Sequence, residues 1–236
     1  LALMYFIIKE VLHRQFIHRK NSELKENLLR AQINPHFIFN ALVAIQGFVY
    51  KNENIEAGKY LGEFSKLIRL TLENTRKEYI SLTKEIEFLE YYLKLQQLRY
   101  SGKFDFQIEV DDNIETDLIE IPPMLTQPFI ENSIEHGLAE KEGKGNINIK
   151  IVAENDFLAI SISDNGIGRR LSQIKRTSAF RHKSYGTEIT QERLDFLRKK
   201  YSYDASYKID DLSDNSGKPS GTLVYFKIPI ISKPLS

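Results

Sequence analysis

The spacing of the apolar residues changes once along this chain, at Ser101-Gly102. Before that point they recur in alternating steps of four and three, which is typical of the seam of packed helices. After it they recur at every second residue, which is typical of half-buried strands. The pattern therefore predicts an α+β protein whose first part is helical and whose second part holds a sheet.

Two seams predict a helical hairpin in the first part. The first comprises Leu24, Leu28, Ala31, Pro35, Ile38, Leu42, Ile45 and Val49. The second comprises Ala57, Leu61, Phe64, Ile68 and Thr71, and the polar residues 51–54 separate the two. One hairpin cannot enclose a core by itself, so we expect two chains to form a homodimer with a four-helix bundle.

Beyond the hairpin, a third amphipathic helix is expected over residues 82–93, with Ser81 or Thr83 as its cap. Period-two alternation then predicts strands at residues 104–110, 147–151, 158–162 and 223–228. Helical stretches are expected at about residues 124–138 and 187–201. Together these elements predict an α/β sandwich in which helices cover one face of a sheet.

The chain opens with an apolar run over residues 1–8, which is too short to cross a bilayer because a span needs roughly 20 apolar residues. The basic residues Lys9, Arg14, Arg19 and Lys20 follow it. A basic flank is typical of the cytoplasmic end of a membrane helix. We therefore interpret residues 1–22 as the end of a membrane helix and a juxtamembrane linker, while an ordinary buried helix start stays the alternative.

Composition narrows the chemistry that the chain can perform. Lys and Arg number 33 against 32 Asp and Glu, so the net charge of +1 gives no electrostatic case for a nucleic-acid partner. Cysteine is absent from the sequence, which excludes a disulfide, a thiolate metal site and a cysteine nucleophile within it. The five histidines show no close ligand pairing beyond His13 and His18, which makes a metal hydrolase unattractive.

His36 is the first candidate for chemistry. It follows Pro35 and lies at the edge of the first seam, where solvent or another domain can reach it. A proline inside a helix removes a backbone hydrogen bond, which destabilises the helix unless another benefit compensates. An ordinary surface or core histidine is the alternative.

The stretch from Gln127 to Gly137 is the second candidate. Asn132 and His136 are four residues apart and are expected to share a helix face. An amide oxygen near carboxylates suits Mg²⁺ that carries nucleotide phosphates, because this ion takes few protein ligands. A plain polar helix face would give the same pattern.

Three glycine-containing turns complete the set. Asp164-Asn165-Gly166-Ile167-Gly168 ends a strand, so a carboxylate is offered to an exocyclic amine while the glycines let the backbone approach a ligand. Gly186 and Thr187 precede a helix, whose free N–H groups suit phosphate. Gly221 and Thr222 precede the last strand. Taken singly, each is also compatible with an ordinary turn.

The order and spacing of these segments resemble the LytS/YehU-like sensor histidine kinases of bacterial two-component systems, from about residue 28 to residue 229. Residues 31–40, AQINPHFIFN, are similar to the phosphoacceptor box of that family almost residue for residue. Residues 82–86 and 92–96 resemble its linking helix, 123–137 its N box, 164–168 its adenine-binding glycine box and 221–229 its closing strand.

The resemblance implies dimerisation and histidine phosphotransfer helices over residues 23–78, a linking helix over 79–101 and a Bergerat-type (GHKL) ATP-binding domain over 102–236. It implies ATP and Mg²⁺ as ligands and the bacterial inner membrane as the location, with this portion in the cytoplasm. Asp164 would accept from the adenine amino group, Asn132 would hold Mg²⁺, and His36 would take the γ-phosphoryl group and pass it to a response regulator aspartate. The remaining nucleotide contacts would come from His136, Gly166, Gly168, Gly186, Thr187, Gly221 and Thr222.

Two departures from the family pattern matter. The family has Gly-x-Gly-Leu-x-Asn where residues 184–189 read SYGTEI, which puts nucleotide affinity or turnover in doubt. Many related kinases carry an acidic residue directly after the phosphoacceptor, whereas Phe37 stands here. We hypothesise that Glu131 orients or deprotonates His36 instead. Asn40, one helical turn beyond His36, either positions a water that attacks a phosphorylated regulator or is a seam-edge amide.

Two rival functions share this fold. The first is a GHKL ATPase that drives a conformational clamp without phosphorylating histidine. The second is a catalytically degenerate dimeric signalling scaffold, which the altered residues 184–189 favour.

Overall fold

The structure is a computed structural model, and it describes residues 4, 9, 35–169, 185–201, 204–214 and 216–232. The helices of these ranges are α2 (Pro35–Tyr50), α3 (Asn54–Thr75), α4 (Leu82–Arg99), α5 (Gln127–Asn132), the π-helical η1 (Ser133–Leu138) and α7 (Tyr185–Tyr201). The strands are β1 (Ile80–Ser81), β2 (Phe104–Val110), β3 (Ile119–Ile121), β4 (Gly145–Glu154), β5 (Phe157–Asp164), β6 (Ser206–Ser213), β7 (Pro219–Pro229) and β8 (Ile231–Ser232). The α+β class is confirmed.

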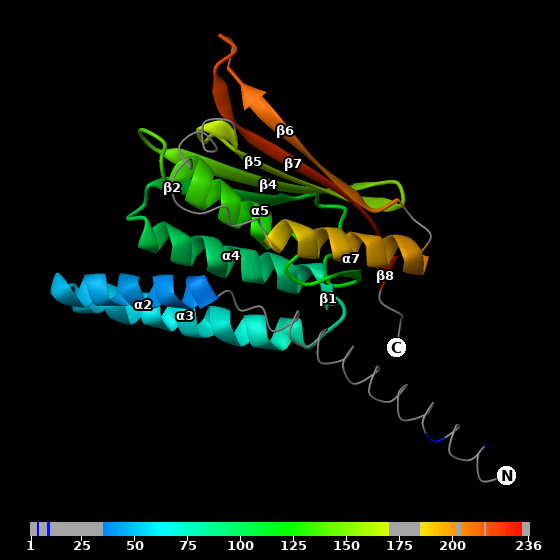
Figure 1. Ribbon diagram of the computed structural model, residues 1–236, viewed down its shortest axis with the longest axis horizontal. Coiled ribbons are helices and arrows are strands. Elements are labelled where there is room, and N and C mark those ends of the chain that lie inside the picture. Colours follow the sequence, from blue (N-terminus) through cyan, green and yellow to red (C-terminus); the bar gives the residue numbers. More distant parts are fainter. Residues whose placement is uncertain are drawn as a thin grey trace.

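The expected hairpin is formed by α2 and α3, which run antiparallel (Figure 1). Aromatic rings hold the two helices together, with ring centroids 5.8 Å apart both for Phe48 and Tyr60 and for Phe37 and Phe64. A tight turn over residues 51–53 joins them, and Asn52 adopts a positive φ of 58° there. The part of the first seam before Pro35 lies outside the described residues.

Helix α4 lies between the hairpin and the sheet (Figure 1). Its cap is Ser81, whose Oγ accepts from the Lys84 backbone N–H at 3.4 Å, whereas the hydroxyl of Thr83 donates to Asp117 instead. Because α4 is covered on both sides, it buries more than a single apolar stripe. The side chains of Leu82, Phe88, Leu89, Tyr92, Leu93 and Leu95 are all buried.

The main sheet has the strand order β2-β4-β5-β7-β6. Only β2 and β4 pair in parallel, and the other neighbours pair antiparallel. Helices α4, α5 and α7 lie on one face of this sheet (Figure 1). The alternating residues predicted from the sequence form the core, among them Ile149, Ile160 and Phe226. The α/β sandwich is therefore confirmed.

Strands β1, β3, β6 and β8 were not expected. Strands β1, β3 and β8 form a small separate sheet and are two or three residues long, which is too short for a periodic signal. Strand β6 pairs with β7 at the edge of the main sheet, and its burial alternates weakly because one side remains in contact with solvent.

The helical stretch expected from residue 124 begins later, at Gln127. Met124 has a φ of +56°, which is incompatible with a right-handed helix. The turn over residues 122–126 is held from two sides. The buried Glu85 accepts from the Met124 backbone N–H at 2.9 Å, and Arg193 of α7 donates to the Met124 carbonyl at 3.1 Å.

Within the described residues, no helix is both long and apolar enough to cross a membrane. The expected membrane segment and linker fall in residues 1–22, of which only Met4 and Lys9 are described. That prediction therefore lies almost wholly outside the described residues.

Candidate nucleotide and phosphotransfer site

Asp164 ends strand β5 and is the centre of the candidate nucleotide site. Its side chain is only 4% exposed. It accepts hydrogen bonds from Ser133 Oγ at 2.8 Å, from the Gly166 backbone N–H at 2.8 Å, and from Thr222 Oγ1. These donors come from η1, from the turn after β5 and from β7, so one carboxylate joins three segments that are far apart in the sequence.

The hydrogen-bonding capacity of Asp164 is not exhausted by these partners. A carboxylate has about four acceptor positions. Three protein donors occupy Asp164, so an acceptor position remains for one further donor. An exocyclic amine is a donor of this kind, which is the chemistry expected from the sequence.

Glycines let the backbone close around Asp164. A Cβ on Gly166 would lie 2.6 Å from the Gly137 backbone, and the Ile167 N–H donates to the Gly137 carbonyl at 3.1 Å. Gly221 has a φ of +138°, and a Cβ there would lie 1.9 Å from the Asp164 carbonyl oxygen. No side chain fits at either position without a shift of backbone. We call Ser133, Gly137, Asp164, Gly166, Gly221 and Thr222 the Asp164 corner.

Gly168 also lies beside this corner, in the turn after β5. Its φ is +75°, a value that favours glycine, and a Cβ there would lie 3.1 Å from Pro219 Cβ. The predicted residues Asp164, Gly166, Gly168, Gly221 and Thr222 are thus brought together by the fold.

The N box (residues 123–137) changes from α5 to the π-helical η1 after Asn132, as the bond from the Ala139 N–H to the Ile134 carbonyl at 2.9 Å shows. Single π turns occur frequently at functional sites. This turn directs Ser133 and Gly137 toward Asp164. Asn132 and His136, the predicted ligand-binding residues, directly precede these two positions and are half-buried.

Asn132 fits the modest protein share that Mg²⁺ requires. Among the described residues there is no cluster of three or more His, Cys, Asp or Glu side chains able to hold a metal. Mg²⁺ bound with a nucleotide is usually held by one or two protein oxygens, and phosphates and waters complete the shell. A single amide oxygen beside the Asp164 corner is compatible with this modest share.

Gly186 and Thr187 lie in the first turn of α7, and the structure does not describe the Thr187 side chain. One turn later, Thr190 Oγ1 donates to the Leu125 carbonyl at 3.3 Å. This bond ties the first part of α7 to the turn at the start of the N box. The proposed phosphate-binding end and the N box are therefore held near each other.

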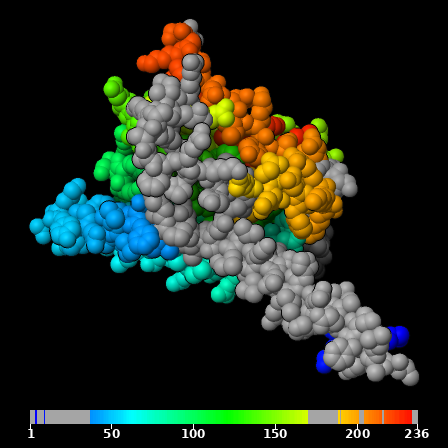
Figure 2. All heavy atoms as spheres, in the orientation of Figure 1, coloured from blue at the N-terminus to red at the C-terminus, as the bar shows by residue number. Residues whose placement is uncertain are grey.

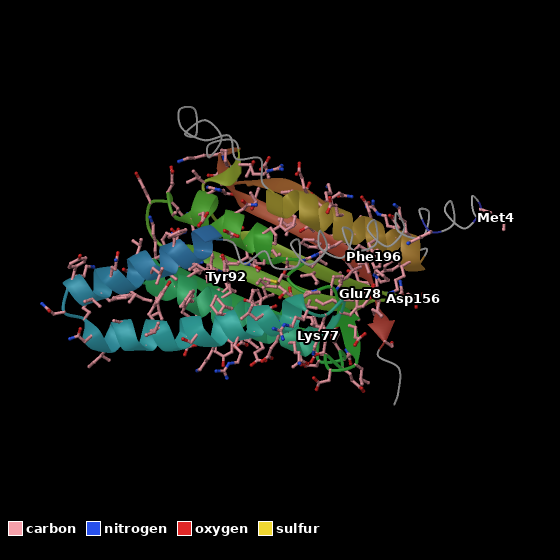
Figure 3. All side chains as sticks on the ribbon, turned by 60° about the horizontal axis from the view of Figure 1, so that its bottom comes forward. Met4, Lys77, Glu78, Tyr92, Asp156 and Phe196 are labelled. Atoms are coloured by element: carbon pink, nitrogen blue, oxygen red, sulfur yellow. The ribbon has the colours of Figure 1, made fainter. Side chains whose placement is uncertain are left out.

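His36 is the second residue of α2, and its side chain lies outside the described residues. The next residue, Phe37, packs its ring against Tyr92 of α4, with centroids 5.7 Å apart. Tyr92 lies on α4 close to the start of α2 (Figure 3). The start of α2 is thus in contact with α4 at the level of Tyr92.

The negative charges of the N box also act on Tyr92. Burial is the main cause that raises the pKa of its hydroxyl, and the negative charges of Glu131 and Glu135 raise this pKa further. Both carboxylates are therefore within electrostatic range of a residue that contacts the start of α2. Tyr92 therefore lies between the start of α2 and the two carboxylates of the N box.

Several residues of this region were missed from the sequence. Ser133 and Gly137 belong to the N-box stretch and have the same spacing as Asn132 and His136, so a helical-face argument could have found them. Glu85, Arg99 and Tyr92 gave no such signal, because they lie among the charged and apolar residues of an ordinary amphipathic helix.

Comparisons with known proteins show the family of the chain. The family model described as histidine kinase matches residues 24–104. The LytS sensor protein of Staphylococcus saprophyticus is 33% identical over 215 residues, which cover 89% of this chain and 35% of that protein. LytS of Staphylococcus epidermidis is 35% identical over 155 residues, which cover 66% of this chain and 25% of that protein. The chain thus spans between a quarter and about a third of the length of these relatives.

Two solved structures can be added. The histidine kinase domain of the Erythrobacter litoralis blue-light activated histidine kinase has a TM-score of 0.47 and 15% identity, covering 88% of this chain and 93% of that one. The catalytic domain of the histidine kinase ThkA has a TM-score of 0.43 and 16% identity, covering 66% and 97%.

The sequence matches place the chain among the histidine kinases. Within that class it belongs to the LytS-like sensor kinases of two-component systems, as its similarity to LytS proteins from several species shows.

Proposed function

We propose that this chain is the kinase portion of a LytS-like sensor, which binds ATP·Mg in its sandwich and phosphorylates His36. The phosphoryl group then passes to an aspartate of a response regulator. The observation that carries the proposal is the Asp164 corner, a buried carboxylate with spare acceptor capacity, in a fold where α4 contacts both the start of α2 and the N box.

For the nucleotide, Asp164 is proposed to accept from the adenine amino group. The glycines at 166, 168 and 221 let the protein segments around Asp164 approach one another closely, which holds its carboxylate in place for this contact. Asn132 would hold Mg²⁺, which neutralises charge on the phosphates. The other proposed contacts come from His136 and Thr222 and, at the start of α7, from Gly186 and Thr187.

For the transfer, a neutral imidazole nitrogen of His36 is the proposed nucleophile, and this form is well populated near pH 7. A bond forms between this nitrogen and the γ-phosphorus, the bond to the leaving ADP oxygen breaks, and Glu131 orients the ring or accepts its proton. The proximity of Glu131 to Tyr92, which contacts the residue after His36, supports this role.

The proposed assembly is a homodimer. On the α2–α3 hairpin, Leu42 and Val49 of the predicted seam are 49% and 52% exposed, and Phe39 and Val43 are 67% and 65% exposed. Figure 2 shows the turn end of the hairpin projecting beyond the rest of the described surface. A second copy would cover these apolar side chains by completing a four-helix bundle.

The proposed location is the bacterial inner membrane, reached through a segment that precedes or includes residues 1–8, with this portion in the cytoplasm. The net charge of +1 continues to argue against a nucleic-acid partner.

A phosphatase step on the regulator is a second proposed activity. The LytS protein of Staphylococcus aureus that is 34% identical over 150 residues is named a sensor histidine kinase/phosphatase. Asn40 lies on α2 one turn after His36 and is half-buried, a place from which its amide could position an attacking water. A phosphorylated regulator that loses phosphate equally fast with Asn40→Ala would remove this role.

The proposal is tested with γ-labelled ATP and Mg²⁺ on the wild type, His36→Gln and Asp164→Asn. We expect acid-labile label on the wild type, nucleotide binding without label for His36→Gln, and loss of both for Asp164→Asn. The exposed Asp105→Asn on β2 serves as the matched control and should behave as the wild type.

Other outcomes identify the rivals. Label that persists in His36→Gln would refute His36 as the acceptor. Release of phosphate without any labelled protein would indicate the ATPase, and nucleotide binding with neither would indicate the scaffold.

A further inference from the structure

Helix α4 carries a row of polar side chains between the hairpin and the sandwich. Tyr92, Gln96 and Arg99 are spaced by four and three residues, so they share one face of the helix. Tyr92 and Gln96 are almost fully buried, at 2% and 3% exposed. Burial of polar groups is costly unless they are hydrogen-bonded. The contacts of these three side chains therefore show which segments the row connects.

One end of this row contacts α2. The Tyr92 ring packs against Phe37, which follows His36 directly in the chain. On α4 itself, Tyr92 also stacks with Phe88, with ring centroids 6.2 Å apart. These aromatic contacts fix the position along α4 at which the start of α2 packs.

The other end of the row contacts the N box. Arg99 forms an ion pair with Glu135 of η1, with Nη1 and Oε1 3.6 Å apart, and donates to Gln96 Oε1 at 3.3 Å. Its guanidinium also lies 4.9 Å from the centre of the Tyr100 ring. The side chains of Arg99 and Glu135 are only 20% and 19% exposed, so solvent screens this pair less than a surface pair.

The contacts of Arg99 are separate from those that define the Asp164 corner. Ser133 and Gly137 of the N box contact Asp164, whereas Glu135, between them, contacts α4. The N box is thus held on one side by the candidate nucleotide site and on the other side by Arg99. Loss of the second contact leaves the first in place.

We propose that Arg99 is a positioning residue for phosphoryl transfer, because it holds Glu135 of the N box and Gln96 of the row that ends at the start of α2. It aligns the N box, including Glu131 one turn before Glu135, with the segment that carries His36. The inference rests on the proposed kinase function, since the alignment matters only if His36 receives the phosphoryl group.

This role predicts a separation between nucleotide binding and transfer. Misplacement of reacting groups by about 1 Å can cost roughly a hundredfold in rate. We expect Arg99→Gln to lower the rate of phosphohistidine formation at saturating ATP by about tenfold or more. The dissociation constant of a fluorescent ATP analogue should stay within about threefold, because the Asp164 corner is untouched.

The experiment measures both quantities, together with the thermal midpoint, on the 236-residue chain. Arg99→Lys keeps the charge and should restore part of the rate. Glu135→Gln removes the same ion pair from the other side and should lower the rate in the same way. Glu135→Gln also tests the role if Arg99→Gln fails to fold, because in this variant the Arg99 guanidinium keeps its contacts with Tyr100 and Gln96. The double variant should be no slower than the slower single variant.

Lys94→Gln is the matched control. Lys94 lies on the same helix and forms an ion pair with Glu90 at 3.0 Å, but both side chains are about half exposed. It should leave the rate and the nucleotide affinity unchanged.

The possible results separate the inference from the proposed function. A wild type that forms phosphohistidine while Arg99→Gln and Glu135→Gln transfer at the same rate would overturn the inference alone. A loss of nucleotide affinity as large as the loss of rate would also overturn it, because Arg99 would then support binding. A wild type that binds ATP but forms no phosphohistidine would refute the proposed function, and the inference with it.

Discussion

The main sheet and the α2–α3 hairpin are both built from regular apolar patterns, but they bury these patterns to different extents. In the sheet, the alternating residues Ile149, Ile160 and Phe226 are 2% exposed or less. In the hairpin, Phe39 and Val43 remain about two-thirds exposed although they belong to an apolar helix. The sandwich supplies both walls of its own core, whereas within the described part of the chain the hairpin is covered by α4 on one side.

The difference indicates separate tasks for the two regions. In the sandwich, the Asp164 carboxylate is buried and hydrogen-bonded to three segments at the edge of a closed core. An exposed apolar face is suited to association with a second copy of the chain and to conformational changes that are transmitted from one copy to the other.

Removal of a side chain from the closed core should have the largest effect. Phe226 is completely buried and packs edge-on against Phe129, with ring centroids 5.1 Å apart. Phe226→Ala should lower the free energy of unfolding by about 3–5 kcal/mol, because a large cavity replaces the ring. Urea unfolding measures this cost. The neighbouring Tyr225→Ala, on the opposite face of the strand, should cost clearly less, and equal costs would show that the sheet is not closed on one face.

The buried carboxyl of Glu85 should make stability depend on pH. Burial raises its pKa from 4.5 to about 7, and the Met124 backbone N–H and Arg193 oppose this only in part. A folded pKa above the unfolded one means that stability is fully present below pH 4.5 and falls as pH rises toward 7. The shift corresponds to a loss of up to about 3 kcal/mol.

Glu85→Gln tests this directly, because glutamine cannot ionise. The variant should resemble the wild type near pH 5 and be the more stable protein near pH 8, as measured by urea unfolding at both pH values. If the two proteins differ by the same free energy of unfolding at both pH values, Glu85 is not the titrating group.

The backbone around Asp164 should tolerate no Cβ at Gly221. Gly221→Ala combines a φ of +138° with a contact of 1.9 Å to the Asp164 carbonyl oxygen, so we expect a loss of at least about 2 kcal/mol and of ATP-analogue binding. Gly217→Ala, in the β6–β7 connection four residues before Gly221, is the control. It has a φ of +79° and nothing within 4 Å, so it should cost about 1 kcal/mol and leave binding intact. Equal binding by both variants would contradict the close approach at Gly221.

Substitutions on the open face should change association rather than folding. Phe39→Ser with Val43→Ser should alter the free energy of unfolding of one chain by less than about 1 kcal/mol. The dimer dissociation constant should rise by about tenfold or more, because both side chains would be central in the bundle. Sedimentation velocity over a concentration series measures this. Leu118→Ser, an exposed residue of the sandwich, should leave the constant unchanged, and a monomeric wild type would refute the dimer.

The sequence predicted the long elements of both regions and much of the site. Period and length sufficed for α3, α4 and the central strands. The glycine segments at 164–168 and 221–222 both contribute to the corner, but the prediction that Gly221 and Thr222 precede the last strand was wrong, because β7 begins at Pro219 and pairs Thr222 with Asp164. The positive φ of Met124 was not predictable, because it depends on Glu85 and Arg193, which are distant in the sequence. The π turn at Ser133 was likewise hidden, since it is set by contacts of Gly137 with the turn after β5.

Contacts between the two regions were the least predictable. At the end of α3, Glu78 accepts from Lys200 of α7 at 2.7 Å, and the Lys200 ammonium lies 4.8 Å from the centre of the Tyr79 ring. Glu78 and Phe196 lie at the opposite end of the molecule from the Tyr92 contact (Figure 3). Neither contact follows from periodicity, because each joins surface residues of separate elements.

The most direct test is to locate the phosphoryl group after incubation of the wild-type chain with ATP and Mg²⁺. Mass spectrometry of peptides prepared at neutral pH, where phosphohistidine survives, should find the group on His36. Phosphate on any other residue, or none on a chain that demonstrably binds ATP, would contradict a transfer from the sandwich to the start of α2.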